Sequence, residues 1–296
     1  MNLSLGVGFL MLVIKFGAYI FTGSTAIFAD AIETVVHIAA VGFAAYSLRL
    51  SQKPADENHP YGHAKISFFS AGAEGMLIVL AALFIIQDAI RKWLTGIELT
   101  NIGLGAGLTA LTVFLNGALG IYLISVGREK DSLILKANGK HVLTDAWTSI
   151  GVIVGLVLAS ITGWLPWDPI LAILVAINIL ITGFSLMRQS IRGLMDEADP
   201  AIRNRLIELL DRETKRHGIS YHELRNRHMG DGHWVDFHLL FKDETPVKTA
   251  HAIATEIERK VKDSLEQQSI VTTHLEPRKD HQRIHTHSTS GPDTRL

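Results

Sequence analysis

The chain has 296 residues, of which 48% are hydrophobic and 19% are charged, and its formal net charge is -1. The near-neutral charge argues against nucleic acid as a partner, because nucleic-acid-binding domains are usually basic. The chain has no cysteine, which excludes disulfides and thiolate metal ligands. Any bound metal would therefore be held by histidine and carboxylate side chains.

Long apolar runs are concentrated before Met195. Six of them have about 20 residues, the length that crosses the hydrocarbon core of a bilayer. These runs are 3–22, 26–48, 67–90, 101–126, 141–163 and 168–187. We therefore predict a transport domain of six transmembrane helices over residues 1–195. The first run is itself long enough to span and lacks a convincing cleavage site after it, so we expect no cleavable signal peptide.

The basic residues between these runs predict the orientation of the chain. An even number of spans places both termini on one side of the membrane, and most of the lysines and arginines fall on that side. They are Arg49, Lys53, Lys65, Arg128, Lys130, Lys136, Lys140, Arg188 and Arg192. Only Arg91 and Lys92 fall on the other side. By the positive-inside rule, the sequence predicts a multi-pass protein of the inner (plasma) membrane with both termini cytoplasmic.

Residues 196–277 are charged and periodic, which is typical of a domain outside the membrane. The pattern predicts a helix over 199–217, strands over 220–228 and 233–241, a helix over 247–267 and a strand over 270–275. This α-β-β-α-β order predicts a small α+β sandwich. Residues 278–296 are polar and lack periodicity, so we expect a disordered tail. Its histidines, His281, His285 and His287, could chelate metal weakly, although such tails more often have no defined site.

Two pairs of metal-ligand residues lie inside the apolar runs. Glu33 and His37, and likewise His141 and Asp145, are four residues apart, which places each pair on one helix face about 6 Å apart. A carboxylate and an imidazole so placed form half of a tetrahedral metal site. Ionisable residues at bilayer depth are costly, and their default interpretation is functional. The sequence predicts that the second and fifth spans face each other and complete one site.

Other buried charges have more than one interpretation. Asp30 lies one turn before Glu33 and is either a further ligand, a proton acceptor or a residue that orients a neighbour. Lys15 in the first span either extends toward the membrane surface or pairs with a carboxylate. Glu74 in the third span has no role that the sequence indicates.

Two more histidine clusters lie outside the membrane. Asp56, His59 and His63 follow the second span and could hold a divalent ion at the membrane surface, or belong to a solvated loop. In the C-terminal domain, three strands and one helix contribute His222, His238, His251, His274 and Glu276. His274 and Glu276 alternate along one strand and therefore share a face.

The sequence resembles the cation diffusion facilitator family, and bacterial zinc/proton antiporters in particular. The resemblance covers roughly residues 1–277 and rests on ordered motifs in both domains. They are Thr22-Gly23-Ser24, Ala29-Asp30-Ala31, Asn58-His59-Pro60-Tyr61-Gly62-His63-Ala64-Lys65, His141-x-x-x-Asp145, His222-Glu223-Leu224-Arg225 and His274-x-Glu276-Pro277.

This resemblance implies roles for the residues named above. Glu33, His37, His141 and Asp145 would form the family's transport site, and Asp56, His59 and His63 its loop site. His222, His238, His251, His274 and Glu276 would form the binuclear site of a ferredoxin-like cytoplasmic domain that joins two protomers in a homodimer. Lys65 and Asp196 would form a charge pair at the membrane surface of that dimer.

Three positions depart from the family pattern. Glu33-x-x-x-His37 stands where the family usually has two aspartates or His-x-x-x-Asp, Glu276 replaces an aspartate, and Asn138 replaces another. The first departure leaves the transported ion open.

Charge balance supports exchange of metal for protons. Two carboxylates and two neutral imidazoles cancel a divalent ion, and protonation of both imidazoles restores neutrality after the ion leaves. We expect a transporter rather than an enzyme, which exports Zn²⁺, the ion that suits a tetrahedral site and that would also fill the cytoplasmic sites. Fe²⁺, Co²⁺, Mn²⁺, Ni²⁺ and Cd²⁺ stay open. The alternatives are a membrane metal sensor or scaffold that transports nothing and, third, a metal-dependent membrane hydrolase.

Overall fold

The computed structural model describes residues 2–129, 133–265 and 268–279. These residues form two compact units. Of the described residues, the first unit takes those within Met1–Tyr46 and Ser70–Arg188, and the second takes those within Ser47–Phe69 and Gln189–Leu296. Residues 280–296, which include most of the expected tail with His281, His285 and His287, lie outside the described residues.

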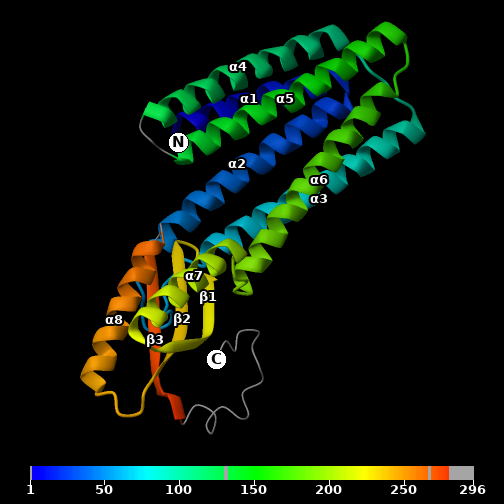
Figure 1. Ribbon diagram of the computed structural model, residues 1–296. Coiled ribbons are helices and arrows are strands. Elements are labelled where there is room, and N and C mark those ends of the chain that lie inside the picture. The colour runs from blue at the N-terminus through cyan, green and yellow to red at the C-terminus, as the bar shows by residue number, and fades with distance from the viewer. Residues whose placement is uncertain (1, 130–132, 266–267, 280–296) are drawn as a thin grey trace. The chain divides into compact units, whose positions relative to one another are not determined.

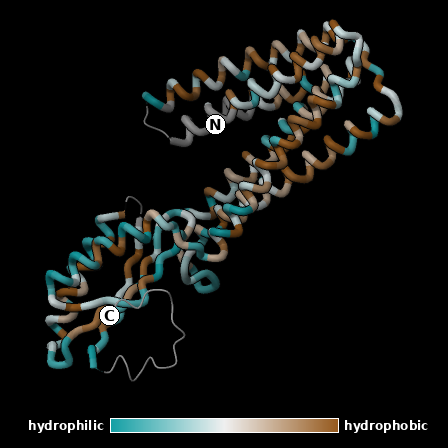
Figure 2. Tube along the Cα trace, turned by 45° about the vertical axis from the view of Figure 1, so that its right-hand side comes forward, coloured by the Kyte–Doolittle hydropathy of each residue, from teal (hydrophilic) through white to brown (hydrophobic). Residues whose placement is uncertain are grey.

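Six helices form the N-terminal part of the chain (Figure 1). They are α1 (Asn2–Thr22), α2 (Thr25–Ser51), α3 (Ile66–Thr95), α4 (Ile102–Glu129), α5 (Leu133–Thr162) and α6 (Trp167–Leu194). The helices α2 to α6 are long and apolar enough to cross a membrane, whereas the apolar stretch described for α1, Gly6–Thr22, is shorter. Hydrophobic residues predominate along these helices (Figure 2). The predicted helical membrane region is confirmed, and the count of six spans depends on α1.

Glycines allow neighbouring helices of the first unit to approach closely. A methyl group added to Gly75 of α3 would lie 2.8 Å from the carbonyl oxygen of Gly183 in α6. A methyl group on Gly139 of α5 would lie 2.9 Å from the carbonyl oxygen of Gly120 in α4. In a bilayer, where apolar burial gives little drive for association, such small residues let backbones pack at short range.

The second unit contains a three-stranded sheet with two helices. Its elements are α7 (Pro200–His217), β1 (Ser220–His228), β2 (Gly232–Phe241), α8 (Val247–Ser264) and β3 (Gln268–Pro277). The strand order is β1-β2-β3, with β1 antiparallel and β3 parallel to β2. The predicted α-β-β-α-β order is confirmed, because the α8 crossover returns the chain for parallel pairing.

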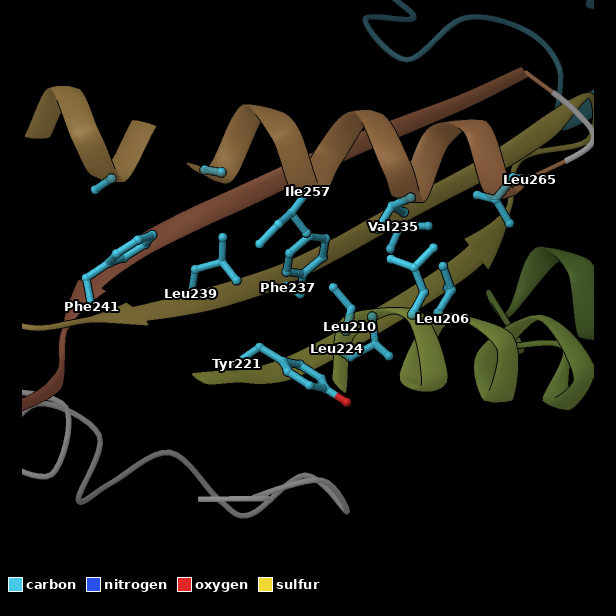
Figure 3. Packing of buried hydrophobic residues seen from close by; sticks show 14 residues of the cluster. Leu206, Leu210, Tyr221, Leu224, Val235, Phe237, Leu239, Phe241, Ile257 and Leu265 are labelled. Atoms are coloured by element: carbon cyan, nitrogen blue, oxygen red, sulfur yellow. The ribbon is translucent and has the colours of Figure 1, made fainter. Parts of the chain in front are cut away.

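Both helices of this domain cover the same face of the sheet. Alternate residues of β2, including Val235 and Phe237, share one buried cluster with Leu210 of α7 and Ile257 of α8 (Figure 3). Period-two alternation turns the residues between them to the opposite face. His238 is one of these residues, and His222 and His274 are its direct strand partners, so these three histidines lie on the face that the helices leave uncovered.

The start of α7 was predicted from Asp199-Pro200, and both residues have the roles at the helix N-terminus that this prediction assumed. The Asp199 carboxylate accepts a hydrogen bond from the backbone N–H of Ala201 at 2.8 Å, and Pro200 occupies the first helical turn. Gly218 ends the helix with a left-handed φ of 64°.

Because α3 and α6 approach closely at Gly75, we predict that valine at this position lowers stability much more than valine at Gly107. We expect Gly75→Val to destabilise the protein by about 1–3 kcal/mol, the usual effect of overpacking. Gly107→Val in α4 is the matched control, because a methyl group there meets nothing within 4 Å. Thermal unfolding in detergent, followed by tryptophan fluorescence, measures both, and equal losses would contradict the packing described.

Candidate metal centres

The helices α2 and α5 meet at the level of the predicted membrane site. The Ser149 hydroxyl of α5 lies 2.9 and 3.0 Å from the two carboxylate oxygens of Asp30 in α2. Asp30 is three residues before Glu33, and Ser149 is four residues after Asp145. The faces that carry Glu33 and Asp145 therefore lie toward each other.

Glu33 has the environment expected of a ligand. Its Oε2 is buried and has no hydrogen-bond partner among the described residues. The Glu33 carboxylate interacts electrostatically with that of Asp145 across the two helices. His37 lies one turn further along α2, and His141 lies in α5 by its backbone, but the side chain of His141 is outside the described part of the structure.

The structure resolves the partner of Lys15. Its Nζ lies 2.9 Å from Asp30 Oδ1 and 2.9 Å from the Thr34 hydroxyl, and both charged side chains are buried. Lys15 therefore pairs with a carboxylate rather than extending to the membrane surface, and Asp30 is held between α1 and α5.

At the other end of α2, a buried carboxylate caps the helix. Asp168, in the first turn of α6, accepts hydrogen bonds from the Ser24 hydroxyl at 2.5 Å and from the backbone N–H groups of Thr25 and Ala26 at 2.7 and 3.3 Å. A carboxylate at a helix N-terminus satisfies free N–H groups and complements the helix dipole. Asp168 was not predicted as a functional residue, although an acidic residue at the start of the apolar run 168–187 could have indicated it.

The loop after α2 brings its three predicted ligands together. One ligand atom from each of Asp56, His59 and His63 lies within 4.8 Å of the others. The Asp56 carboxylate accepts a hydrogen bond from the backbone N–H of His59 at 2.8 Å, and this bond, with Lys53, holds the Asp56 pKa well below its usual range. The loop thus presents an ionised, oriented carboxylate beside two imidazoles, as a cation site requires.

Strand register builds the third cluster. His222, His238 and His274 are direct partners across β1, β2 and β3. Glu276, two residues beyond His274, reaches this row: its carboxylate lies 3.1 Å from His222 Nε2, 2.7 Å from His238 Nδ1 and 3.6 Å from His274 Nε2. His222 and Glu276 are buried, whereas His274 is exposed. We call these four residues the histidine row.

Two residues near the histidine row differ from expectation. His251 is exposed on α8, which covers the opposite face of the sheet, so one chain alone does not bring it to the row. Glu223 was not predicted. A break in the β1–β2 register and a left-handed φ of 51° at Glu223 place its carboxylate 3.9 Å from His238 Nε2.

A further group of ligand types, Glu213, His217 and Glu256, lies between α7 and α8. Its centre is already occupied by a cation of the chain, because Lys260 Nζ lies 2.6 Å from Glu213 and 2.7 Å from Glu256. The hydrogen bond from Lys260 lowers the Glu213 pKa, and that to Glu213 raises the pKa of Lys260. We interpret this group as an ion-pair network between the helices, not as a metal site.

The predicted charge pair of Lys65 and Asp196 forms within one chain. Lys65 Nζ lies 2.7 Å from one carboxylate oxygen of Asp196, and Arg227 lies 3.0 Å from the other. Partial burial opposes the charged form of Asp196, but the two cations outweigh it and hold the Asp196 pKa below its usual range. Asp196 itself has a left-handed φ of 56°.

This pKa direction gives a pH-dependent prediction for Asp196→Asn. The substitution keeps a residue type that tolerates left-handed backbone but removes the charge. A lowered folded-state pKa stabilises the protein above the unfolded pKa of about 4 and ceases to do so as pH falls through the folded value. We expect the variant to melt a few degrees below wild type at neutral pH, with the gap closing in acid. A gap independent of pH would contradict the pairing.

Two family models match successive parts of the chain. A family model of the cation efflux transmembrane domain matches residues 1–195, and one of the cytoplasmic domain of cation efflux proteins matches residues 198–278. The chain is 36% identical over 278 residues to an uncharacterized transporter of Synechocystis sp., which covers 94% of this chain and 89% of the relative.

It is 29% identical over 252 residues to the cation-efflux pump FieF of Salmonella arizonae, which covers 85% of this chain and 83% of the pump. Among solved structures, the Zn form of the protein CzrB is 26% identical with a TM-score of 0.27, over 29% of this chain and 94% of that chain. Because the transmembrane model alone matches well over half of the chain, this integral membrane protein belongs to the cation diffusion facilitator family of cation efflux proteins.

Proposed function

We propose that the protein exports a divalent metal cation, Zn²⁺ first of all, from the cytoplasm in exchange for protons. The observation that carries this proposal is the buried Glu33 Oε2, which has no hydrogen-bond partner among the described residues and lies on α2 where it meets α5. A buried carboxylate oxygen without a partner is costly at bilayer depth. Binding of a cation there removes that cost.

The charges around Glu33 support a site for a divalent ion. Asp30 is neutralised by Lys15, so its charge does not add to the site. Glu33 and Asp145 then supply two negative charges, and His37 and His141 supply neutral nitrogen ligands. Such a site is neutral when a divalent ion is bound, and neutrality lowers the cost of its burial in a low dielectric.

The same balance supports coupling to protons. Metal and protons compete for imidazole nitrogens, and the pKa of an ordinary histidine lies near ambient pH. When the ion leaves, two protons restore neutrality. Inward proton movement would then drive metal outward as the helix bundle exposes the site to each side in turn.

Ligand type favours Zn²⁺ among the divalent ions. Two imidazoles and two carboxylates suit tetrahedral Zn²⁺ and disfavour Mg²⁺ and Ca²⁺, which prefer oxygen ligands. Fe²⁺, Co²⁺, Mn²⁺, Ni²⁺ and Cd²⁺ are the alternatives, since the order of affinity alone does not set selectivity.

The C-terminal domain and the loop after α2 would face the cytoplasm, as the positive-inside rule predicts for an inner-membrane protein. The histidine row lies on the face of the sheet opposite its helices, where the similarity to cytoplasmic domains of cation efflux proteins supports a homodimer. A non-transporting sensor or scaffold would need these cytoplasmic sites but not the charge-balanced set on α2 and α5. A hydrolase would instead need an open coordination position and a general base.

Flux measurements test the proposal. We expect Asp145→Ala or His141→Ala to reduce metal-driven proton exchange in proteoliposomes to background, because each removes a ligand. Thr182→Ala is the matched control, since this exposed α6 hydroxyl donates a hydrogen bond to the carbonyl of Asn178 in its own helix and contacts no proposed ligand among the described residues. The assay uses an imposed pH gradient and a panel of divalent ions. Full flux in either ligand variant would refute the assignment, and binding without flux in wild type would favour the sensor.

Zinc stoichiometry tests the histidine row separately. We expect Glu276→Gln to lower the bound Zn²⁺ per protomer and the dimer fraction, because Glu276 contacts all three imidazoles of the row. Glu256→Gln serves as control, since Lys260 already occupies that cluster. Elemental analysis and light scattering measure the two quantities. Equal zinc loss in both variants would contradict the distinction between the clusters.

A further inference from the structure

A buried ion pair outside the four proposed ligands connects three helices. Lys15 of α1 contacts Asp30 Oδ1 and the Thr34 hydroxyl of α2, each at 2.9 Å. Ser149 of α5 lies 2.9 and 3.0 Å from the two Asp30 oxygens. The side chains of Lys15 and Asp30 are only 4% and 2% exposed. The interior of the membrane unit thus holds a fully formed polar network.

This network leaves Asp30 little capacity to bind metal. One of its carboxylate oxygens already contacts the ammonium of Lys15, and both contact Ser149. A divalent ion bound to the same carboxylate would lie beside the ammonium, and like charges repel strongly at low dielectric. A proton-acceptor role meets the same obstacle, because the carboxylate is already paired with the ammonium.

The network nevertheless flanks the metal site on both helices. Asp30 is one turn before Glu33 on α2, and Ser149 is one turn after Asp145 on α5. A hydrogen bond between Asp30 and Ser149 therefore fixes the rotation of the two helices on which the ligands lie. Lys15 supplies the charge that cancels Asp30.

We propose that Lys15, Asp30 and Ser149 act as positioning residues, which hold α2 against α5 and keep the metal site at two negative charges. This inference rests on the proposed function of Glu33, His37, His141 and Asp145. In this proposal the Asp30 carboxylate forms an ion pair with Lys15 and does not bind the transported ion.

Removal of either charge alone unbalances the site in opposite directions. Lys15→Met leaves the Asp30 carboxylate unpaired beside Glu33, so that a proton takes over the charge balance from the lysine and metal must displace it. Asp30→Asn leaves the Lys15 ammonium unpaired, and it repels the incoming ion. The double variant Lys15→Met/Asp30→Asn carries neither charge, and its amide can still accept a hydrogen bond from Ser149.

A double-mutant cycle in proteoliposomes tests the proposal. We expect each single variant to lose at least about tenfold in Zn²⁺ flux, and Lys15→Met to move the pH midpoint of flux upward by about one unit, the equivalent of a tenfold change. The double variant should recover flux to within about threefold of wild type, because the energies of contacting charges are not additive. A double variant as inactive as Asp30→Asn would overturn the proposal and indicate a ligand or proton acceptor. Unimpaired single variants would overturn it as well.

Two further variants separate the possible failures. Ser149→Ala keeps both charges, so it should lower the maximal rate without moving the pH midpoint; an unchanged rate would overturn the positioning role. Asp145→Asn tests the metal site itself, and full flux there would reject the proposed function whatever the cycle gives. Size-exclusion profiles identify variants that do not fold, and the neutral double variant decides the proposal even where a single variant is lost.

Discussion

The membrane unit depends on one constraint: a charge taken out of water must meet a partner inside the protein. The Lys15–Asp30 pair and the Asp168 cap satisfy it with groups of the chain itself. Each of these contacts also joins different helices, α1 to α2 and α6 to α2. Because each buried charge needs its partner, these contacts also fix the position of α2 against α1 and α6. Glu33 Oε2 differs, because the described residues supply it with no hydrogen-bond partner.

Much of the fold could be predicted because its signals are local. Apolar runs of spanning length predict α2 to α6, and Asp199-Pro200 predicts the start of α7 to within one residue. Period-two alternation gives the strands. The glycine contacts between α3 and α6, and the irregular register of β1 at Glu223, could not be predicted, because they depend on which elements become neighbours in space.

The candidate sites divide in the same way. Spacing along one helix or loop placed Glu33 with His37 and grouped Asp56 with its histidines. Pairings between elements were left open: the partner of Lys15 lies 15 residues away on another helix, and Asp168 reaches Ser24 across 144 residues. In the Glu213 cluster, the residue types alone suggest a metal site. The position of Lys260, which pairs with Glu213, shows that it is an ion-pair network.

Parallel pairing of β3 with β2 has a consequence for how the histidine row is assembled. The hairpin of β1 and β2 is local in sequence and brings only His222 and His238 together. His274 and Glu276 arrive with β3, after α8 has crossed over, and contacts that close long stretches of chain form slowly. A half-folded domain therefore offers two imidazoles, and the complete sheet offers four donors. Affinity for a metal ion is thus coupled to the pairing of β3 with β2. A metal ion bound at the histidine row would stabilise the complete three-stranded sheet, which forms late in folding.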